Sequence, residues 1–404
     1  MGTITKIQWT DHTLNPWRGC GKVHTGCAHC YAESQSGRNP LMLGIWGDAG
    51  TRILAADKMW SEPIKWNRCA ILRCDVCGHE AFTEPAPGTY DPLSLSWDFE
   101  CPCCVNCTTY TSRHPRVFCA SLADIFEDWS GQVRNHLGQP LWLTKNGNVE
   151  AQAMPGHSDG IFWESGSIPL RLSHLRLRLF DLIDKTPYLD WLLLTKRPEN
   201  IQKMWPDYFP GGYIAEAGSM NQTGPRRNVW LGTSISDQAT ANKAVPELLR
   251  CRDLAPVRFI SAEPLVGPID LEDALPSEDQ VALRRGHRCE LDWVIVGGES
   301  GPKARPCRPE WVRSLVRQCQ LFEVPVFVKQ MGANVITRND AIEDEFNNGV
   351  SGWPDPQVQH DIHGFREEFQ GADCRIKLRD RKGGDPDEWP QDLRVRQFPE
   401  VQHD

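Results

Sequence analysis

Three cysteines that could hold a metal centre lie near the start of the sequence. Cys20, Cys27 and Cys30 occupy a glycine-bearing loop that follows an expected strand. Thiolates are ligands of soft metal centres, and three of them can hold a cubane iron–sulfur cluster while one iron stays without a protein ligand. An open metal position is where chemistry takes place, so this spacing favours a catalytic site. Zinc as the metal and His29 as a fourth ligand remain open alternatives.

A second group of cysteines has the spacing of a zinc site. Two Cys-x2-Cys pairs separated by 23 residues supply four thiolates for a closed tetrahedral site. These four are Cys74, Cys77, Cys101 and Cys104. Their segment contains few large apolar residues, so its folding would depend on the metal. We interpret it as a zinc-ribbon-like module, with Cys103 and Cys107 leaving the choice of the second pair open.

Short buried strands alternate with helices along the rest of the chain. Strand-like runs cover residues 4–9, 116–119, 189–195, 228–234, 257–263, 293–298 and 324–330, and most end in glycine or polar residues. Helical patterns lie between them, the clearest at 170–185 and another that opens at Pro309. This alternation predicts an α/β fold with a parallel sheet, and about seven strands indicate a partial or full (β/α) TIM-like barrel. Chemistry in such barrels gathers at the carboxyl ends of the strands, where the first cysteine loop is expected.

Composition divides the chain into four parts. Residues 1–68 form the first part of the barrel with the cluster loop, 69–114 the zinc-ribbon-like insertion and 115–338 the remainder of the barrel. Residues 339–404 are rich in Asp, Glu, Gly and Pro, which predicts an acidic, loosely structured C-terminal extension.

Charge and hydropathy exclude some classes of protein. The chain has 44 Lys and Arg against 53 Asp and Glu, so a globally basic nucleic-acid coat is excluded, although a local basic cleft is not. No run reaches the roughly 18 to 20 apolar residues of a membrane span, and the N-terminus lacks a signal core. Paired cysteines without a signal peptide indicate metal binding in a reducing cytoplasm.

Ordered motifs give the chain a family resemblance. They are Asn15-Pro-Trp-x-Gly-Cys20, Gly26-Cys27-x-x-Cys30-Tyr31-Ala-Glu33, Ser121-Leu-Ala-Asp124-Ile-Phe, Leu194-Thr195-Lys196-Arg197-Pro, Val229-Trp-Leu-Gly232, Ser261-Ala-Glu263-Pro264-Leu and Val296-Gly297-Gly298-Glu299-Ser300-Gly. The sequence thereby resembles a phage-borne three-cysteine family of unknown function, which is similar to radical S-adenosylmethionine enzymes. The usual loop of those enzymes is Cys-x3-Cys-x2-Cys, whereas this chain has Cys-x6-Cys-x2-Cys.

The resemblance implies an enzyme that uses a [4Fe-4S] cluster and S-adenosylmethionine to generate a deoxyadenosyl radical. Nucleobase modification or repair in phage biology is the expected reaction, in the host cytoplasm, with nucleic acid as substrate and flavodoxin or ferredoxin as electron donor. Polar groups at strand ends would contact the cofactor, and Lys329 and Gln330 would face the substrate. The expected cofactor contacts are Ser121, Asp124, Thr195, Lys196, Ser234, Glu263 and Glu299.

A different class of function also fits the cysteines. If all of them bind zinc, the protein is a non-catalytic adaptor for nucleic acid or for another protein. Purified protein that contains zinc alone would favour this alternative. A barrel-type metal hydrolase ranks lower, because no His-x-His pair or paired His and carboxylate occurs at the strand ends.

Overall fold

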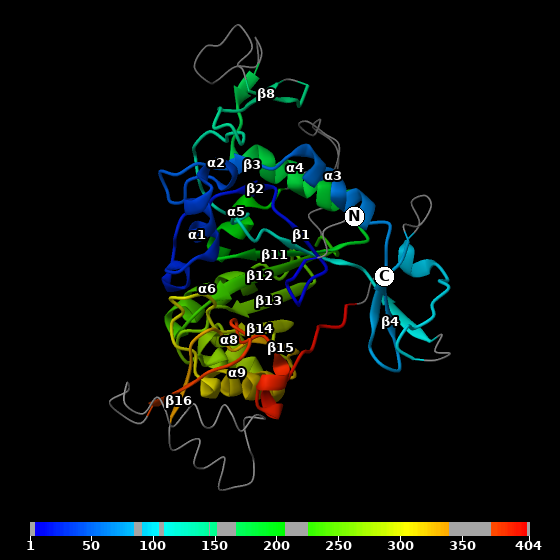
Figure 1. The fold of residues 1–404 in the computed structure, drawn as a ribbon, viewed down its shortest axis with the longest axis vertical. Helices are drawn as coiled ribbons and strands as arrows, with labels where there is room; N and C mark the ends of the chain where they lie inside the picture. The colour runs from blue at the N-terminus through cyan, green and yellow to red at the C-terminus, as the bar shows by residue number, and fades with distance from the viewer. Residues whose placement is uncertain are drawn as a thin grey trace.

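The computed structural model describes residues 5–84, 91–104, 109–144, 146–151, 167–206, 225–338 and 373–401. A seven-stranded parallel sheet forms its centre and curls into a half-barrel (Figure 1). Along the sheet the strands are β1 (His12–Leu14), β7 (Arg116–Cys119), β11 (Asp190–Thr195), β12 (Val229–Ile235), β13 (Val257–Ala262), β14 (Trp293–Gly297) and β15 (Val326–Gln330). The partial (β/α) barrel predicted from the alternating pattern is compatible with this sheet.

The described residues form helices α1 (Tyr31–Arg38), α2 (Pro40–Leu43), α3 (Asp57–Trp66), α4 (Leu172–Asp184), α5 (Ile201–Met204), α6 (Gln238–Leu249), α7 (Leu271–Ala274), α8 (Ser277–Arg284) and α9 (Pro309–Leu321). Of these, α4, α6 and α9 pack on the convex face of the sheet. The apolar positions of α4, α6 and α9 pack with alternate residues of the strands in one large core cluster. Because strand side chains alternate between faces, the remaining strand residues must point to the concave side.

Aromatic rings fill part of the concave face. A separate core cluster contains six aromatic residues and three aliphatic strand residues. They are Trp9, Phe118, Trp230, Phe259, Trp293 and Phe327, with Leu192, Val257 and Ile295. Trp293 is the first residue of β14, and its ring lies at 5.7 to 6.3 Å, centre to centre, from several of the others. Large rings of this kind bury more apolar area than any other side chain. The amino ends of the strands are therefore closed by packing.

Small antiparallel sheets decorate the half-barrel. They comprise β2 (Trp17–Arg18) with β3 (Ile53–Leu54); β5 (Glu80–Phe82), β4 (Ile71–Cys74) and β6 (Tyr110–Arg113); β10 (Ser167–Pro169), β8 (Trp142–Thr144) and β9 (Val149–Glu150); and β16 (Val335–Arg338) with β17 (Asp373–Ile376). In Figure 1 the sheet that contains β4 lies on the right of the half-barrel. Helix α1 lies on the left, beyond the carboxyl ends of the barrel strands.

The first strand differs from its expected position. The run 4–9 was expected as a strand, but β1 is His12–Leu14, and Trp9 is buried on the concave face instead of pairing in the sheet. Residues 1–4 lie outside the described part of the chain. β1 is short and polar, and it is defined by its parallel pairing with β7, His12 opposite Val117.

Part of the C-terminal segment is also firmly packed. Trp389 has no exposed surface, and the backbone of residues 395–397 bonds to β15, with Val328 N donating to Val395 O at 2.8 Å. The expected loose extension over 339–404 is therefore wrong for residues 373–401, while residues 339–372 and 402–404 lie outside the described part. Buried apolar side chains such as Trp389 and Leu393 pack this segment against the rest of the protein despite its acidic composition.

None of the helices in the described ranges is long and apolar enough to cross a membrane.

Candidate active site and metal centre

Four cysteines lie close together at the sheet formed by β4, β5 and β6. The sulfur atoms of Cys74, Cys77, Cys101 and Cys104 all lie within 4.8 Å of one another, and those of Cys77 and Cys101 are 3.5 Å apart. Thiolates bound tetrahedrally to one zinc ion at 2.3 Å would be separated by about 3.8 Å. The set could therefore hold a metal ion such as zinc.

The local backbone explains how the first pair meets. Cys74 ends β4, and Gly78 adopts a φ of +73°, which allows the tight turn directly after Cys77. The thiols of Cys77, Cys101 and Cys74, together with burial, raise the pKa of Cys104 above its ordinary value. Crowded thiols disfavour ionisation, so a cation is needed before all four can be thiolates. Cys103 is exposed and outside the set, and Cys107 lies outside the described residues.

The first cysteine loop crosses the carboxyl ends of the half-barrel strands. It begins after β2, contains a 3₁₀ turn at Thr25–Cys27 and ends at Cys30, the N-cap residue of α1. At its centre, Thr25 Oγ1 donates to Asp237 Oδ2 at 2.9 Å, just after β12. A Cβ on Gly26 would overlap Ser236 Oγ, so glycine lets the loop lie directly on the end of this strand.

At one end of the loop, Cys20 belongs to a buried charged network. Arg197, which follows β11, places Nη1 3.6 Å from Cys20 Sγ and 3.0 Å from Asp124 Oδ2. Glu127 accepts from the Gly21 amide at 2.7 Å. Burial, with the carboxylates of Asp124 and Glu127, raises the pKa of Cys20 to about 12, although Arg197 opposes the rise. In the metal-free protein Cys20 is therefore a neutral thiol.

A second arginine completes this network. Arg52 has no exposed side-chain surface and binds Glu127 with two bonds, Nε to Oε2 at 2.7 Å and Nη2 to Oε1 at 2.8 Å. Asp124 is likewise occupied, since it accepts from Thr195 Oγ1 at 2.6 Å and from the Lys196 amide at 3.0 Å. Buried charges are retained when they are paired in this way. The network fixes the entrance of the loop relative to β7 and β11.

At the other end of the loop, His29 contacts the end of β14. His29 Nδ1 lies 3.1 Å from Glu299 Oε2, and Arg305 Nη2 donates to Glu299 Oε1 at 2.7 Å. Arg305 Nη1 also donates to the Thr25 carbonyl at 2.8 Å. Burial alone would raise the pKa of Glu299, but its hydrogen bonds with Arg305 and His29 and the charge of Arg305 lower it. The loop is thus attached to β11, β12 and β14.

Further polar groups lie at the middle strand ends. Lys329 Nζ is 2.8 Å from Glu263 Oε1, and Ser261 Oγ donates to Glu263 Oε2 at 3.2 Å. Tyr31 donates its hydroxyl to the Ser121 carbonyl at 2.6 Å.

The expected site residues differ in how many of their polar atoms are already hydrogen-bonded within the protein. Asp124 and Glu299 are saturated by donors, so they act as organisers of the loop. Ser234 Oγ bonds to the Glu263 carbonyl at 2.9 Å, and Gln330 Nε2 donates to the Gly298 carbonyl at 2.8 Å. Glu263 and Lys329 form a pair that is partly accessible, with side chains 14% and 26% exposed.

Sequence reasoning missed several members of the site. Arg52, Glu127 and Arg305 were not expected there, and no local motif distinguishes them. Arg197 and Tyr31 lie inside the motifs that carry the family resemblance, which was the available signal.

The two cysteine groups differ in spacing. Among the described residues, the group of side chains close enough to share one metal ion is Cys74, Cys77, Cys101 and Cys104, and Cys20, Cys27 and Cys30 form no such group. Thiolates of an iron–sulfur cluster bind different irons, so they stand farther apart than thiolates that share one zinc ion. The loop therefore supplies three thiols, which are soft donors, but the described structure does not gather them around one point.

Fold and site together define an α/β half-barrel protein with a cysteine-bearing loop across its strand ends and a separate four-cysteine group. The chain belongs to the family described as "Protein of unknown function (DUF5131)", whose sequence model matches residues 4–146 and 161–371. No curated protein and no solved structure matches it.

Proposed function

We propose that this protein is a radical S-adenosylmethionine-type enzyme whose cluster is held by Cys20, Cys27 and Cys30. The observation that carries the proposal is the course of the cysteine loop across the carboxyl ends of the parallel strands, where barrel enzymes place their chemistry. Such a cluster, with S-adenosylmethionine, supplies one electron to break a carbon–sulfur bond and generate a deoxyadenosyl radical.

The residues of the chain position and shield this site. Arg197 donates to Cys20 and opposes the effect of burial, so it favours the thiolate form that a metal requires. Glu299 and Arg305 fix the segment beside His29, adjacent to Cys30. These attachments hold the loop in one position, as the ligands of a reactive centre require.

The middle strand ends supply the groups for cofactor and substrate. The Glu263 carboxylate could accept hydrogen bonds from a ribose or an ammonium group, and Lys329 and Gln330 close that side of the site. Nucleobase modification or repair, in the cytoplasm and with a flavodoxin or ferredoxin as donor, is the reaction that we propose. The phage context of the resemblance supports that choice of substrate.

Anaerobic purification tests the proposal. We expect iron and sulfide in the wild-type protein, deoxyadenosine on reduction with S-adenosylmethionine, and loss of both in Cys27→Ala. Cys251→Ala, which alters a buried cysteine after α6, serves as a control that should retain both. Iron that survives Cys27→Ala unchanged, or iron-loaded protein that yields no deoxyadenosine, would overturn it.

A second candidate function is a zinc-binding adaptor for nucleic acid or protein. The convergence of Cys74, Cys77, Cys101 and Cys104 favours it, because a closed four-thiolate site is typical of structural zinc ribbons. Protein that contains zinc alone, with no iron after anaerobic reconstitution, would support the adaptor and exclude the enzyme.

A further inference from the structure

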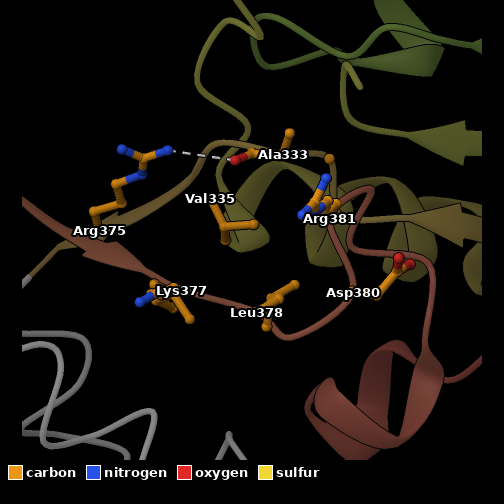
Figure 2. Close-up of a pocket in the computed structure, with 9 residues that line it drawn as sticks. Ala333, Val335, Arg375, Lys377, Leu378, Asp380 and Arg381 are labelled. Atoms are coloured by element: carbon orange, nitrogen blue, oxygen red, sulfur yellow. Dashed lines mark hydrogen bonds between the residues drawn. The ribbon is translucent and has the colours of Figure 1, made fainter. Parts of the chain in front are cut away.

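A surface cavity of about 190 Å³ lies beyond the end of β15 (Figure 2). One wall is the segment from Gly332 to Val335, and the other is β17 with the loop that follows it. The apolar side chains of Val335 and Leu378 form part of the lining. Figure 2 shows Arg375 and Arg381 on opposite sides of the cavity.

Positive charge dominates this lining. Two guanidinium groups, those of Arg375 and Arg381, and one carboxylate, that of Asp380, belong to the lining. The Asp380 carboxylate already accepts from the Gly384 amide at 2.6 Å, so part of its charge is compensated locally. The cavity therefore favours an anion.

Among the described residues, few acceptors contact the two arginines. Arg375 makes one long bond to this part of the chain, from Nη2 to the Ala333 carbonyl at 3.5 Å. Arg381 is exposed, and within the described ranges no acceptor contacts its guanidinium. A guanidinium presents a fork of donors that matches two oxygens of a phosphate. Two such forks on either side of one cavity suit a phosphate group.

The size of the cavity decides which part of a ligand it can take. Pockets that enclose a whole small molecule usually measure about 300 to 1,000 Å³. At about 190 Å³ this cavity is smaller, so it takes a charged group of a ligand whose remainder lies outside.

The cavity is joined to the strand-end site. Gly332 has a φ of +90°, and a Cβ there would lie 2.8 Å from the Glu299 carbonyl, so glycine permits this close approach. The Ala333 amide donates to the same carbonyl at 2.8 Å. Because the Glu299 carboxylate contacts His29, a single residue separates the cavity wall from the cysteine loop.

We propose that this cavity binds a phosphate group of a nucleic-acid strand and holds the strand beside the carboxyl ends of the barrel strands. The inference rests on the proposed function for the reaction that follows binding, but the binding itself depends on the cavity alone. A phosphate of a free nucleotide offers the same chemistry, so the test separates the two sources.

The test measures binding of a fluorescent single-stranded oligonucleotide to the full chain by anisotropy over a series of salt concentrations. Arg381→Gln should weaken binding about tenfold, since a charge-assisted hydrogen bond is lost. The slope of log affinity against log salt should become shallower by about 0.7 for the lost phosphate contact. Adenosine monophosphate, added as competitor, distinguishes the sources: weak competition supports a strand, and competition at equal concentration overturns it in favour of free nucleotide.

Lys382→Gln provides the matched control. Lys382 is exposed, carries the same charge and neighbours Arg381, but its side chain does not line the cavity. It should leave affinity within about twofold of wild type. Equal weakening by both variants, unchanged binding in Arg375→Gln/Arg381→Gln, or no binding by the wild type would overturn the proposal.

The two proposals fail separately. Arg381→Gln should retain wild-type iron content and deoxyadenosine formation without nucleic acid, because the cavity holds no ligand of the cluster. Cys27→Ala should in turn retain oligonucleotide affinity.

Discussion

Arg197 donates a hydrogen bond to the sulfur of Cys20 across 177 residues of sequence, with Nη1 3.6 Å from Sγ. The same guanidinium bonds to Asp124 and Glu127, so one side chain connects the cysteine loop to two buried carboxylates. The position of Cys20, the first ligand of the cluster that we propose, therefore depends on the side chain of Arg197.

Replacing this arginine should destabilise the protein. Arg197→Met leaves Asp124 and Glu127 buried with fewer partners, and removing one member of a buried ion pair costs about 3–5 kcal/mol. Urea denaturation of the full chain measures the loss. Arg250→Met removes an arginine that is 65% exposed and should change stability by less than about 0.5 kcal/mol. Equal losses in the two variants would contradict a special role for Arg197.

The four-cysteine set predicts a selective effect on zinc. Cys74→Ser should release zinc and loosen the sheet formed by β4, β5 and β6, because a closed site needs all four thiolates. Cys103→Ser alters an exposed thiol of the same segment outside the set and should retain zinc. Metal analysis after dialysis against a weak chelator gives the comparison. Zinc that is lost equally from both variants would rule out this choice of ligands.

The attachment of the loop to β14 should depend on acid. Arg305 and His29 lower the pKa of Glu299 despite its burial, so the attachment is complete above the unfolded pKa of about 4.3 and weakens as pH falls through the lowered value. Glu299→Gln should expose the loop amides at every pH, with local protection reduced by about 1–3 kcal/mol. Hydrogen exchange of residues 20–30 is the measurement. Glu272→Gln, at a surface ion pair, is the control, and a similar change there would count against the assignment.

Asp190 should make stability decrease as pH rises toward neutrality. Burial raises its pKa to about 7, although Arg116 and Arg113 oppose the shift. An unfolded Asp loses its proton near pH 3.9, so the folded chain retains one more proton between roughly pH 4 and 7, and its stability falls across that range. Asp190→Asn should remove this slope in denaturation measured from pH 4 to 8. Asp128→Asn, at an exposed position, should preserve it, and a slope that persists without Asp190 would refute the expectation.

The C-terminal segment should contribute to global stability. The ring of Phe398 lies 5.4 Å from that of Trp293 and 5.3 Å from that of Phe327, and Arg116 stacks over it at 4.0 Å. Phe398→Ala should lower the free energy of unfolding by about 2–4 kcal/mol. This is less than the roughly 3–5 kcal/mol expected for a fully buried phenylalanine, because Phe398 is only partly buried. Leu321→Ala, at a side chain 80% exposed, should have almost no effect. A loosely attached tail would show no difference between the variants.

The sequence predicted most strands of the sheet because their signal is local. The strands β11 to β15 are short, rich in Val, Ile and Leu, and end in polar residues, which is the pattern of a buried parallel sheet. β1 lacked this signal, since His12 and Thr13 form most of it and its pairing with β7 joins segments about 105 residues apart. The alternation that ends at Trp9 reflects burial of that ring on the concave face.

The cysteines could be grouped from spacing, whereas their supporting residues could not. Cys74 and Cys101 belong to repeated Cys-x2-Cys pairs, and the structure brings those pairs together. Arg52 bonds to Glu127, which lies 75 residues away in the sequence, and Arg305 bonds to Thr25, which lies 280 residues away. Local sequence patterns do not predict pairs with such large sequence separations. The packed C-terminal segment was missed because a few anchors, such as Trp389, were averaged into an acidic composition.

The backbone of residues 395–397 alongside β15 has a consequence for the behaviour of the protein in concentrated solution. A half-barrel has two edges where a closed barrel has none, and an exposed edge can recruit a strand from another molecule and start aggregation. Here the chain itself occupies the edge at β15, through bonds at Val328 and Gln397, while β1 at the opposite edge is only three residues long. The open sheet is thus protected against edge-to-edge assembly at both of its margins.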